Sequence, residues 1–405
     1  MPSPTVLRQF PDSTDINGSD NVGIQRPIER PLRLGFVGTY PPTQCGIATF
    51  TESLVVSMQA VQSGVSPLVI RLRESAAILE PSPAPILDWY HNNPASFQNV
   101  IHCLHDVDMV IVQHEYGIFG GKDGSEIVEL LQHSPVPSLV VLHTVPQDPT
   151  PHQRAILQDV LELSDMCVVQ SNSALQRLLR EFPGQTLRVV VIPHGAWTTP
   201  ATTPEHASER PRVLTWGLVG PGKGLEHGIA AMADVVRSVP EAEYVIAGET
   251  HPKVREHEGE RYRDSLQARV TQLGLENNVT FCDRYMDRLA LQHLVESADV
   301  VLLPYDSREQ VTSGVLVEAL AAGQPVVSTA FPHAIEALST GAGSVVSHGD
   351  AHAMATAITR ILTQSEIAQP MQREARRIGA QLSWQIVASQ YLNVVNQTVH
   401  RTAAA

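Results

Sequence analysis

The stretch LRLGFVGTYPPTQCGIATF, residues 32–50, contains the pattern that decides the fold. Its first part, residues 32–37, is a short apolar run typical of a buried strand. The second part, residues 38–50, is a loop rich in Gly and Pro that opens a helix at about Ala48. A strand that continues through such a loop into a helix is the repeating unit of doubly wound α/β domains.

Apolar runs and helical stretches alternate along the rest of the chain, which predicts parallel sheets covered by helices on both faces. In the first half we predict strands at residues 68–72, 107–113, 138–142, 166–170 and 188–192, and a helix at 151–163. Residues 193–212 are rich in Pro, Thr, Ser and Ala, and the pattern then restarts. The second half has predicted strands at 213–218, 243–247, 279–282, 299–304, 325–329 and 343–346, and helices at 225–239, 289–297 and 315–322.

A chain of 405 residues is long enough for two domains. We expect two Rossmann-like doubly wound parallel-sheet domains that face each other across a cleft. The expected boundaries are a disordered tail at 1–31, a first domain at 32–195, a linker at 196–211, a second domain at 212–380 and a helix at 381–400 that returns to the first domain.

The composition excludes several classes of protein. The net charge of −14 argues against nucleic acid as a partner. The four cysteines show no Cys-x-x-Cys spacing, so zinc and disulfide frameworks are not indicated and we expect a cytoplasmic protein. No signal segment or stretch of transmembrane length is found, which leaves peripheral membrane contact open. The oligomeric state is not indicated.

Two glycine-containing loops at strand ends are candidates for phosphate binding. Gly46 allows a ligand to approach the backbone where a helix begins, although many such glycines serve packing alone. In the second half, residues 217–226 (GLVGPGKGLE) join a strand to a helix, and Lys223 supplies a positive charge. This loop is neither a Walker A motif nor a dinucleotide-binding Gly-x-Gly-x-x-Gly motif. A surface turn with a solvated lysine is the alternative.

The loop and helix start at residues 305–318 (YDSREQVTSGVLVE) are more informative. Thr312, Ser313 and Gly314 suit a helix N-terminus, whose amides attract a phosphate. Glu318 lies about one turn into that helix, where a carboxylate accepts hydrogen bonds from two neighbouring ribose hydroxyls. The alternative is an acid that only favours the helix N-terminus.

In the first half, polar side chains end two predicted strands. Gln113 ends one strand and is followed by His114 and Glu115, and His143 follows the next strand. We expect His114 and Glu115 to bond acceptor hydroxyls or one another, with a buried satisfied pair as the alternative. The pairs His102/His105 and His114/Glu115 could suggest a metal site. Neither pair is accompanied by a third ligand at a familiar spacing, so we predict no metal site.

Five segments together resemble the retaining glycosyltransferases of family 4, the glycosyl transferases group 1. They are residues 40–50, 191–195 (VIPHG), 220–224 (GPGKG), 299–318 and 322–328. The resemblance extends over nearly the whole chain after the tail. It is greatest to a bacterial branch with a Gln-x-Thr-Ser-Gly segment (310–314) and a Ser-Thr-x-x-x-His-Ala segment (328–334).

The resemblance implies a GT-B fold and specific roles for several residues. Lys223 and the glycines Gly46 and Gly314 belong with the donor diphosphate, Glu318 with the ribose and His143 with the sugar. Gly248 lies near the diphosphate and ribose. The family signature has two glutamates eight positions apart, whereas here Gln310 takes the first position. Leu218 stands where relatives commonly have an arginine, and Arg308 is a candidate to replace it.

The implied reaction transfers a hexose from a UDP- or GDP-sugar to a carbohydrate or glycolipid acceptor, with retention of anomeric configuration and no further cofactor. His143, Gln310 and Lys223 are the expected catalytic residues. Three alternatives remain. They are a non-catalytic nucleotide- or sugar-binding protein, favoured by Gln310 and Leu218, a sugar-nucleotide epimerase, and a phosphorylase with pyridoxal phosphate on a lysine. A nicotinamide dehydrogenase is disfavoured because its glycine fingerprint is absent.

Overall fold

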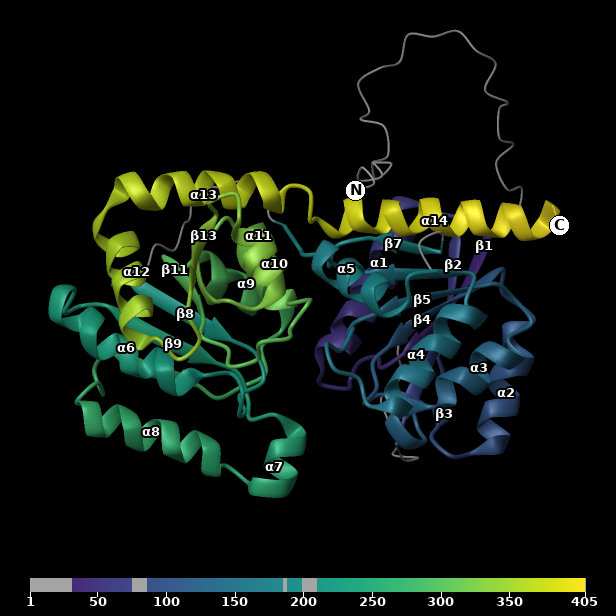
Figure 1. Ribbon diagram of the computed structural model, residues 1–405, viewed down its shortest axis with the longest axis horizontal. Coiled ribbons are helices and arrows are strands. Elements are labelled where there is room, and N and C mark those ends of the chain that lie inside the picture. Colours follow the sequence, from purple (N-terminus) through teal and green to yellow (C-terminus); the bar gives the residue numbers. More distant parts are fainter. Residues whose placement is uncertain (1–30, 75–85, 185–187, 199–209, 405) are drawn as a thin grey trace, which may run out of the picture.

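The computed structural model describes residues 31–74, 86–184, 188–198 and 210–404. The predicted disordered tail, apart from residue 31, lies outside the described residues. Most of the predicted linker, residues 199–209, also lies outside them. The described part forms two α/β units that lie side by side (Figure 1).

The first unit is built on a parallel sheet of seven strands in the order β3-β2-β1-β4-β5-β6-β7. Its elements are β1 (Leu32–Gly38), α1 (Gly46–Val61), β2 (Val65–Arg73), β3 (Ile86–Tyr90), α2 (Pro94–Leu104), β4 (Met109–His114), η1 (Lys122–Gly124), α3 (Glu126–His133), β5 (Ser138–Leu142), α4 (Pro151–Leu163), β6 (Met166–Val169), α5 (Asn172–Glu181) and β7 (Val189–Val191).

The second unit is built on a parallel sheet of six strands in the order β10-β9-β8-β11-β12-β13. Its elements are β8 (Arg212–Trp216), α6 (Leu225–Ser238), β9 (Glu243–Ala247), α7 (Pro252–Glu258), α8 (Arg261–Leu273), β10 (Val279–Cys282), α9 (Arg288–Glu296), β11 (Val300–Leu303), α10 (Gly314–Ala321), β12 (Val326–Thr329), α11 (Pro332–Leu338), β13 (Gly343–Val346), α12 (Ala351–Thr363) and α13 (Ser365–Gly379). A last helix, α14 (Trp384–Ala404), follows.

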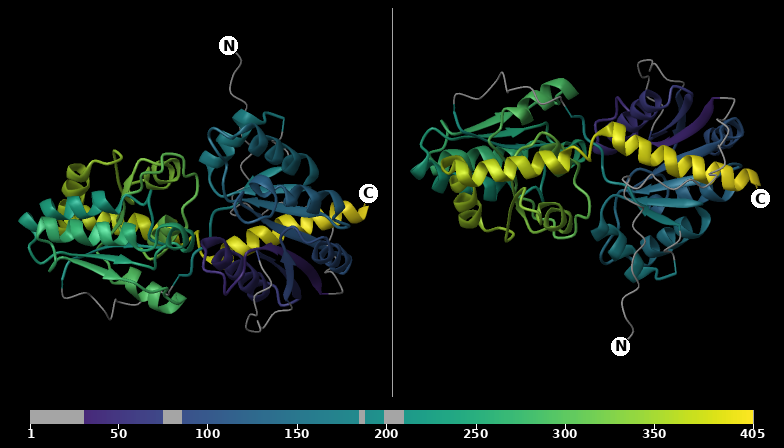
Figure 2. Two further views of the ribbon diagram at one scale, coloured as in Figure 1. Left: turned by 90° about the horizontal axis from the view of Figure 1, so that it is seen from below. Right: turned by 90° about the horizontal axis from the view of Figure 1, so that it is seen from above.

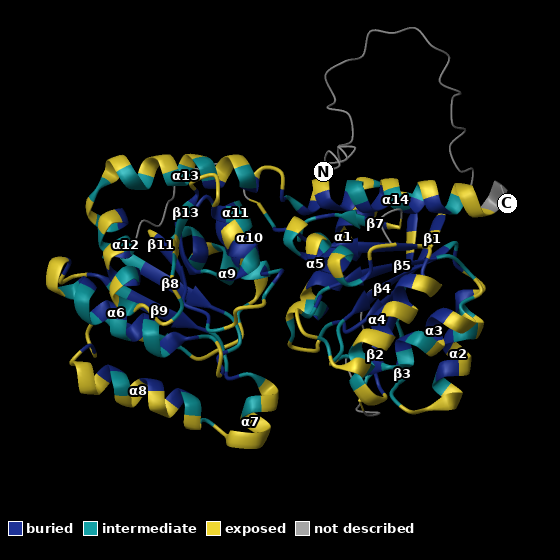
Figure 3. Ribbon diagram, viewed as in Figure 1, coloured by how far each residue is buried: buried dark blue, intermediate teal, exposed yellow. Residues whose placement is uncertain are grey.

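Each sheet has a hydrophobic core on both faces, as a parallel sheet requires. In the first unit α2 to α5 cover one face, and α1 and α14 cover the other. In the second unit α6, α8 and α12 cover one face, and α9, α10, α11 and α13 cover the other. The central strands are buried while the outer helix faces are exposed (Figure 3). Runs of Val, Ile and Leu in the strands therefore correspond to burial on both faces.

The chain crosses between the units twice, and the two crossings are bonded to each other. The amide of Ala196 donates to Leu382 O at 2.7 Å, and the amide of Trp384 donates to Ala196 O at 3.0 Å. A Cβ at Gly195 would lie 2.4 Å from the ring of Trp384, so glycine is needed for this close approach. Beyond the crossing, α13 and α14 run end to end along the two units (Figure 2).

Candidate functional site

The order of the strands reverses between β1 and β4 in the first sheet and between β8 and β11 in the second. In open parallel sheets, ligands bind beyond the carboxyl ends of the strands at such a reversal. Several of the candidate residues lie at the ends of these four strands, in the loops after them or at the start of the next helix. They are Gly46, His114, Glu115, Lys223, Arg308 and Gln310.

The carboxyl-end loops of the two sheets contact each other. Ser171 Oγ donates to Val311 O at 2.6 Å, across the boundary between the units. At another point of the boundary, the hydroxyls of Thr49 and Tyr285 lie 3.4 Å apart. The two strand-order reversals therefore face the same interface, as predicted from the sequence.

Lys223 lies in a loop whose shape depends on glycine. Gly224 has a φ of 61°, and a Cβ there would lie 1.9 Å from Pro304 O. The loop therefore packs closely on the end of β11. Lys223 Nζ lies 4.4 Å from the ring centroid of Tyr305, also in the loop after β11. An ammonium over an aromatic ring is held in place while its hydrogens remain available to a phosphate.

The helix start at α10 is as predicted, but one of its amides is occupied. Ser313 is the N-cap, and its Oγ accepts from the amide of Leu316 at 3.3 Å. The Ser313 amide, expected to face a diphosphate, instead donates to His333 Nδ1 at 2.9 Å. This expectation is wrong for the described conformation, since the imidazole already fills the amide's bonding position. The amides of Gly314 and Val315 remain as the first donors of the helix.

Glu318 lies one turn into α10 and has an unusual environment. The indole Nε1–H of Trp216 donates to its Oε2 at 3.1 Å. Burial raises the pKa of Glu318 from 4.5 to about 7. A buried carboxylate that accepts one hydrogen bond here has capacity for the hydroxyl donors of a ribose.

Gln310 and Arg308 lie in the loop before α10. The side-chain Nε2 of Gln310 donates to Thr312 O at 2.9 Å, so the amide folds over its own loop. The hydroxyl Oγ1 of Thr312 is buried and has no hydrogen-bond partner among the described residues. Arg308 is exposed. Its role in place of Leu218 stays a prediction.

The two predicted glycines differ in what they are needed for. Gly248 has a φ of 132°, and a Cβ there would lie 2.1 Å from Gly217 O. Packing of two strand ends is therefore sufficient to explain Gly248. Gly46 is exposed, and a Cβ there would meet no atom within 4 Å. Packing does not explain Gly46, which is consistent with a ligand that approaches the start of α1.

In the first unit, His143 is held as a neutral ring. Its Nε2–H donates to Gln113 Oε1 at 2.8 Å, and the ring lies edge-on to Phe50 with centroids 4.9 Å apart. Burial, with smaller effects from His194 and His114, lowers the pKa of His143 to about 3. A neutral imidazole of such low basicity is suited to orienting a hydroxyl rather than to removing its proton.

The neighbouring polar atoms of the first unit lack partners. Gln113 Nε2 and both ring nitrogens of His114 are buried and accept or donate no hydrogen bond among the described residues. Burial lowers the pKa of His114 to about 4. Buried polar groups are nearly always bonded, so such atoms at a strand end indicate a ligand or ordered water.

Glu115 does not bond His114, contrary to one of the two expectations. Its carboxylate accepts from the hydroxyl of Thr144 and, at 2.9 Å, from the amide of Tyr116. These nearer donors satisfy it locally. A role for Glu115 on the acceptor side stays a prediction.

Two histidines at the interface were not identified from the sequence. His194 Nδ1–H donates to Gly195 O at 2.7 Å, and a Cβ at Gly314 would lie 2.9 Å from His194 Nε2. His194 of the first unit therefore touches the start of α10. The second is His333, which binds the Ser313 amide. Both lie in segments quoted for the resemblance, but the segments do not show which loop the rings contact.

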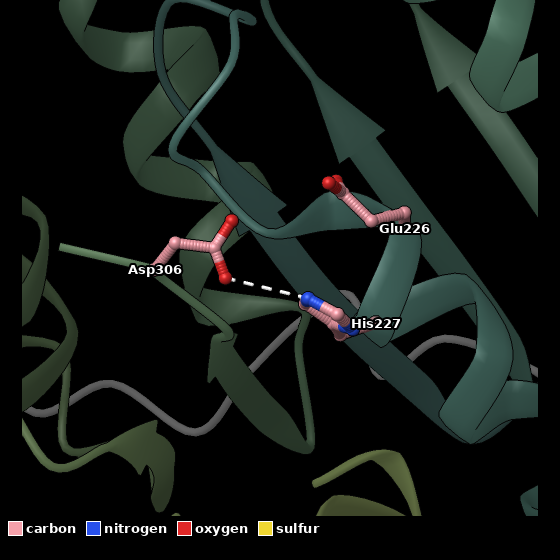
Figure 4. Close-up of side chains that lie close together, drawn as sticks. All are labelled: Glu226, His227 and Asp306. Carbon is pink, nitrogen blue, oxygen red and sulfur yellow. Dashed lines mark ion pairs between the residues drawn. The ribbon is translucent and has the colours of Figure 1, made fainter. Parts of the chain in front are cut away.

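One group of three side chains could supply metal ligands within the described ranges. Glu226, His227 and Asp306 have ligand atoms that all lie within 4.8 Å of one another (Figure 4). His227 Nε2 pairs with Asp306 Oδ1 at 3.3 Å, and the hydroxyl of Tyr262 donates to Glu226 at 2.8 Å. The first contact joins the start of α6 to the loop after β11, and the second joins α8 to α6. The prediction that no metal is required stays a prediction.

None of the helices in the described part of the chain has the length and apolar character needed to cross a bilayer.

Comparisons with known proteins agree with the geometry. Residues 202–378 match the family model described as glycosyl transferases group 1. A comparison with curated proteins found no match. Among solved structures, sucrose-phosphate synthase from Thermosynechococcus elongatus is similar with a TM-score of 0.72 and 19% identity, over 92% of this chain and 100% of that one.

Two further structures show the same fold. HepE from Anabaena, in complex with UDP and glucose, has a TM-score of 0.70 and 18% identity, over 90% of this chain and 100% of that one. WaaG, a glycosyltransferase involved in lipopolysaccharide biosynthesis, has a TM-score of 0.63 and 16% identity, over 89% of this chain and 99% of that one. The predicted fold class, two doubly wound parallel α/β units of the GT-B type, is confirmed.

Proposed function

We propose that the chain, whose residues 202–378 match the glycosyl transferases group 1 model, transfers a hexose from a nucleotide-sugar donor with retention of configuration. UDP-hexose is the first candidate donor, since the solved relatives include HepE with UDP and glucose and a trehalose-6-phosphate protein with UDP-2-fluoro glucose. GDP-hexose is the second. The acceptor is a carbohydrate or glycolipid.

The observation that supports this proposal is the unequal chemistry of the two sides of the interface. The second unit offers a cation, Lys223, and the start of α10. The first unit offers neutral groups, among them His143 and Gln113. A donor that is anionic at its diphosphate and neutral at its sugar matches this arrangement.

The chemistry follows from these placements. Breaking the bond between the anomeric carbon and the phosphate leaves negative charge on the diphosphate. Lys223 and the amides of Gly314 and Val315 stabilise that charge without reorganising. The acceptor hydroxyl attacks from the same face of the sugar, and a phosphate oxygen takes its proton. His143 and Gln310 orient the sugar.

Thermal melting in the presence of nucleotides tests the proposal. A ligand that binds only the folded chain raises the melting temperature, by an amount that grows with its affinity. We expect UDP and UDP-glucose to raise it more than ADP does, with GDP and GDP-mannose as the second set. Lys223→Ala should remove most of the increase. Lys253→Ala, at an exposed lysine on α7, is the matched control and should keep it.

Two results would overturn the proposal. One is that none of these nucleotides or nucleotide sugars changes the melting temperature. The other is that Lys223→Ala and Lys253→Ala respond equally to the ligand.

A further inference from the structure

The main chain of residues 309–313, which carries Gln310 and leads into α10, is held by both units. From the first unit, Arg177 Nη1 donates to Glu309 O at 2.9 Å. Ser171 Oγ, also from the first unit, donates to Val311 O at 2.6 Å. The second unit alone therefore does not determine the conformation of this segment.

His333 of the second unit binds two other main-chain groups of this segment, the carbonyl of Gln310 and the amide of Ser313. Its main-chain amide donates to Gln310 O at 3.3 Å, and its Nδ1 accepts from the Ser313 amide at 2.9 Å. His333 is 7% exposed. The groups bound by the first and the second unit therefore alternate along the segment. Both units hold the main chain around Gln310, the residue that the proposed function assigns to the sugar.

The two donors of the first unit are themselves fixed in position. Arg177 is 5% exposed, and its Nη1 also donates to Val145 O at 2.8 Å, within the first unit. Ser171 is the N-cap of α5, and its Oγ accepts from the amide of Ala174 at 3.0 Å. Donors held in this way impose a position on the segment that they bind.

A carboxylate joins α5 to the helix that contains His333. Glu336, on α11, accepts from Ser173 Oγ at 2.6 Å and from the amides of Ser173 and Asn172 at 2.7 and 2.9 Å. It thus satisfies the free N-terminal amides of α5 from the other unit. These hydrogen bonds lower the pKa of Glu336, so it remains a carboxylate at neutral pH.

We propose that α5 is a positioning element for the donor sugar: Arg177 and Ser171 hold residues 309–313 so that Gln310 meets the sugar only when the two units are in contact. The inference rests on the proposed function. It makes recognition of the sugar depend on contact between the units, whereas the Lys223 loop, which lies wholly in the second unit, binds the diphosphate without that contact. Arg177 and Ser171 act through Gln310 and touch no substrate themselves.

The test compares variants of α5 for binding and turnover. Arg177→Met keeps the length of the side chain and removes its donors, Arg177→Lys restores a donor, and Arg180→Met is the matched control at an exposed position of the same helix. Affinities for UDP and for UDP-glucose are measured by calorimetry on the full chain, and turnover by release of UDP from UDP-glucose.

For Arg177→Met we expect kcat to fall about tenfold or more. We also expect the affinity for UDP-glucose to fall to that for UDP, while the affinity for UDP changes less than about twofold. Arg177→Lys should recover part of kcat, and Arg180→Met should match the unsubstituted chain. Ser171→Ala provides a second variant should Arg177→Met fail to fold, and the same selective loss is expected.

Equal loss of UDP and UDP-glucose affinity would overturn the inference, because it would show a general structural effect. Unchanged kcat in both Arg177→Met and Ser171→Ala would also overturn it. In both cases the unsubstituted chain still binds UDP, so the proposed function survives. If the unsubstituted chain binds neither UDP nor UDP-glucose, the UDP-hexose assignment fails and the inference fails with it.

Discussion

Glu318→Gln should make the chain more stable and less able to bind a nucleotide. Burial raises the pKa of Glu318 from 4.5 to about 7, so folding costs free energy whenever the side chain is ionised. Above pH 7 that cost reaches about 3 kcal/mol. Glutamine is neutral, and its side-chain oxygen can still accept from Trp216 Nε1, which removes the cost and keeps the contact.

The sign of the pH dependence follows from the raised pKa. Between pH 4.5 and 7 the folded chain binds a proton at Glu318 that the unfolded chain has released, so this contribution to stability is lost as the pH rises toward 7. The gain from Glu318→Gln should therefore be about 2 kcal/mol larger at pH 8 than at pH 5.

The buried histidines work in the opposite direction. Their lowered pKa values cause stability to fall as the pH drops below 6.5, which is why each variant is compared with the unsubstituted chain at the same pH. They are His114, His143, His194 and His333.

Glu318→Gln should weaken nucleotide binding although it raises stability. Two ribose hydroxyls that donate to a carboxylate contribute more than the same hydroxyls at an amide, and the loss of one hydrogen bond to a charged group costs about 1.5–3 kcal/mol. We therefore expect Glu318→Gln to bind UDP about tenfold to a hundredfold more weakly at pH 8.

Urea unfolding at pH 5 and pH 8 measures the stability, and calorimetry with UDP measures the affinity. Glu366→Gln, at an exposed carboxyl on α13, is the control and should change neither quantity. The reasoning is refuted if Glu318→Gln is no more stable than the unsubstituted chain at pH 8. Unchanged UDP affinity would show that Glu318 does not bind the ribose.

Four further predictions follow from single contacts. Gly46→Ala should keep a free energy of unfolding within about 1 kcal/mol of the unsubstituted chain and bind UDP more weakly. Gly248→Ala should lower the free energy of unfolding in urea by about 2 kcal/mol or more, because its Cβ would meet Gly217 O at 2.1 Å. Equal stability of the two variants would contradict this. Since the pKa of His143 is about 3, His143 does not titrate between pH 5 and pH 8. The rates of transfer by the unsubstituted chain and by His143→Gln should therefore change in parallel over that range. A bend in the pH profile of the unsubstituted chain alone would contradict this. Treatment with a chelator should leave turnover unchanged. If turnover is lost, returns when a divalent ion is added and is also lost in His227→Ala, an ion binds at Glu226, His227 and Asp306. Trp384→Ala, at a residue 2% exposed, should cost about 3–5 kcal/mol by urea unfolding, and a cost below about 1 kcal/mol would show that α14 is not firmly packed on the first unit.

The strands with continuous apolar runs could be predicted closely from the sequence. Residues 138–142 and 243–247 are β5 and β9 as predicted. In contrast, β3 (Ile86–Tyr90) was not predicted, because it is an edge strand with a charged residue at its centre. Asp88 is compatible with that strand only because it pairs with Arg71 of β2 at 2.7 Å. A partner in another strand is not visible in a local pattern.

The part of the candidate site that lies in the second unit was also predictable in part. Lys223 and the start of α10 stand at strand ends, where a local pattern of glycine, lysine and a capping serine identifies them. Arg177 and Glu336 were not identified, because in the sequence each looks like an ordinary charge on a helix. Only the contact between the units shows that they bind main-chain groups of the opposite unit.

The most direct test of the central claim is release of UDP from UDP-glucose, and of GDP from GDP-mannose, by the unsubstituted chain and by Lys223→Ala in parallel. Release measures cleavage of the sugar–phosphate bond whether water or an acceptor takes the sugar. We predict measurable release of one of the two nucleotides, reduced at least about a hundredfold by Lys223→Ala, since loss of a preorganised charge contact costs about 2.7–4 kcal/mol in the transition state. Release that Lys223→Ala leaves unchanged would contradict the account.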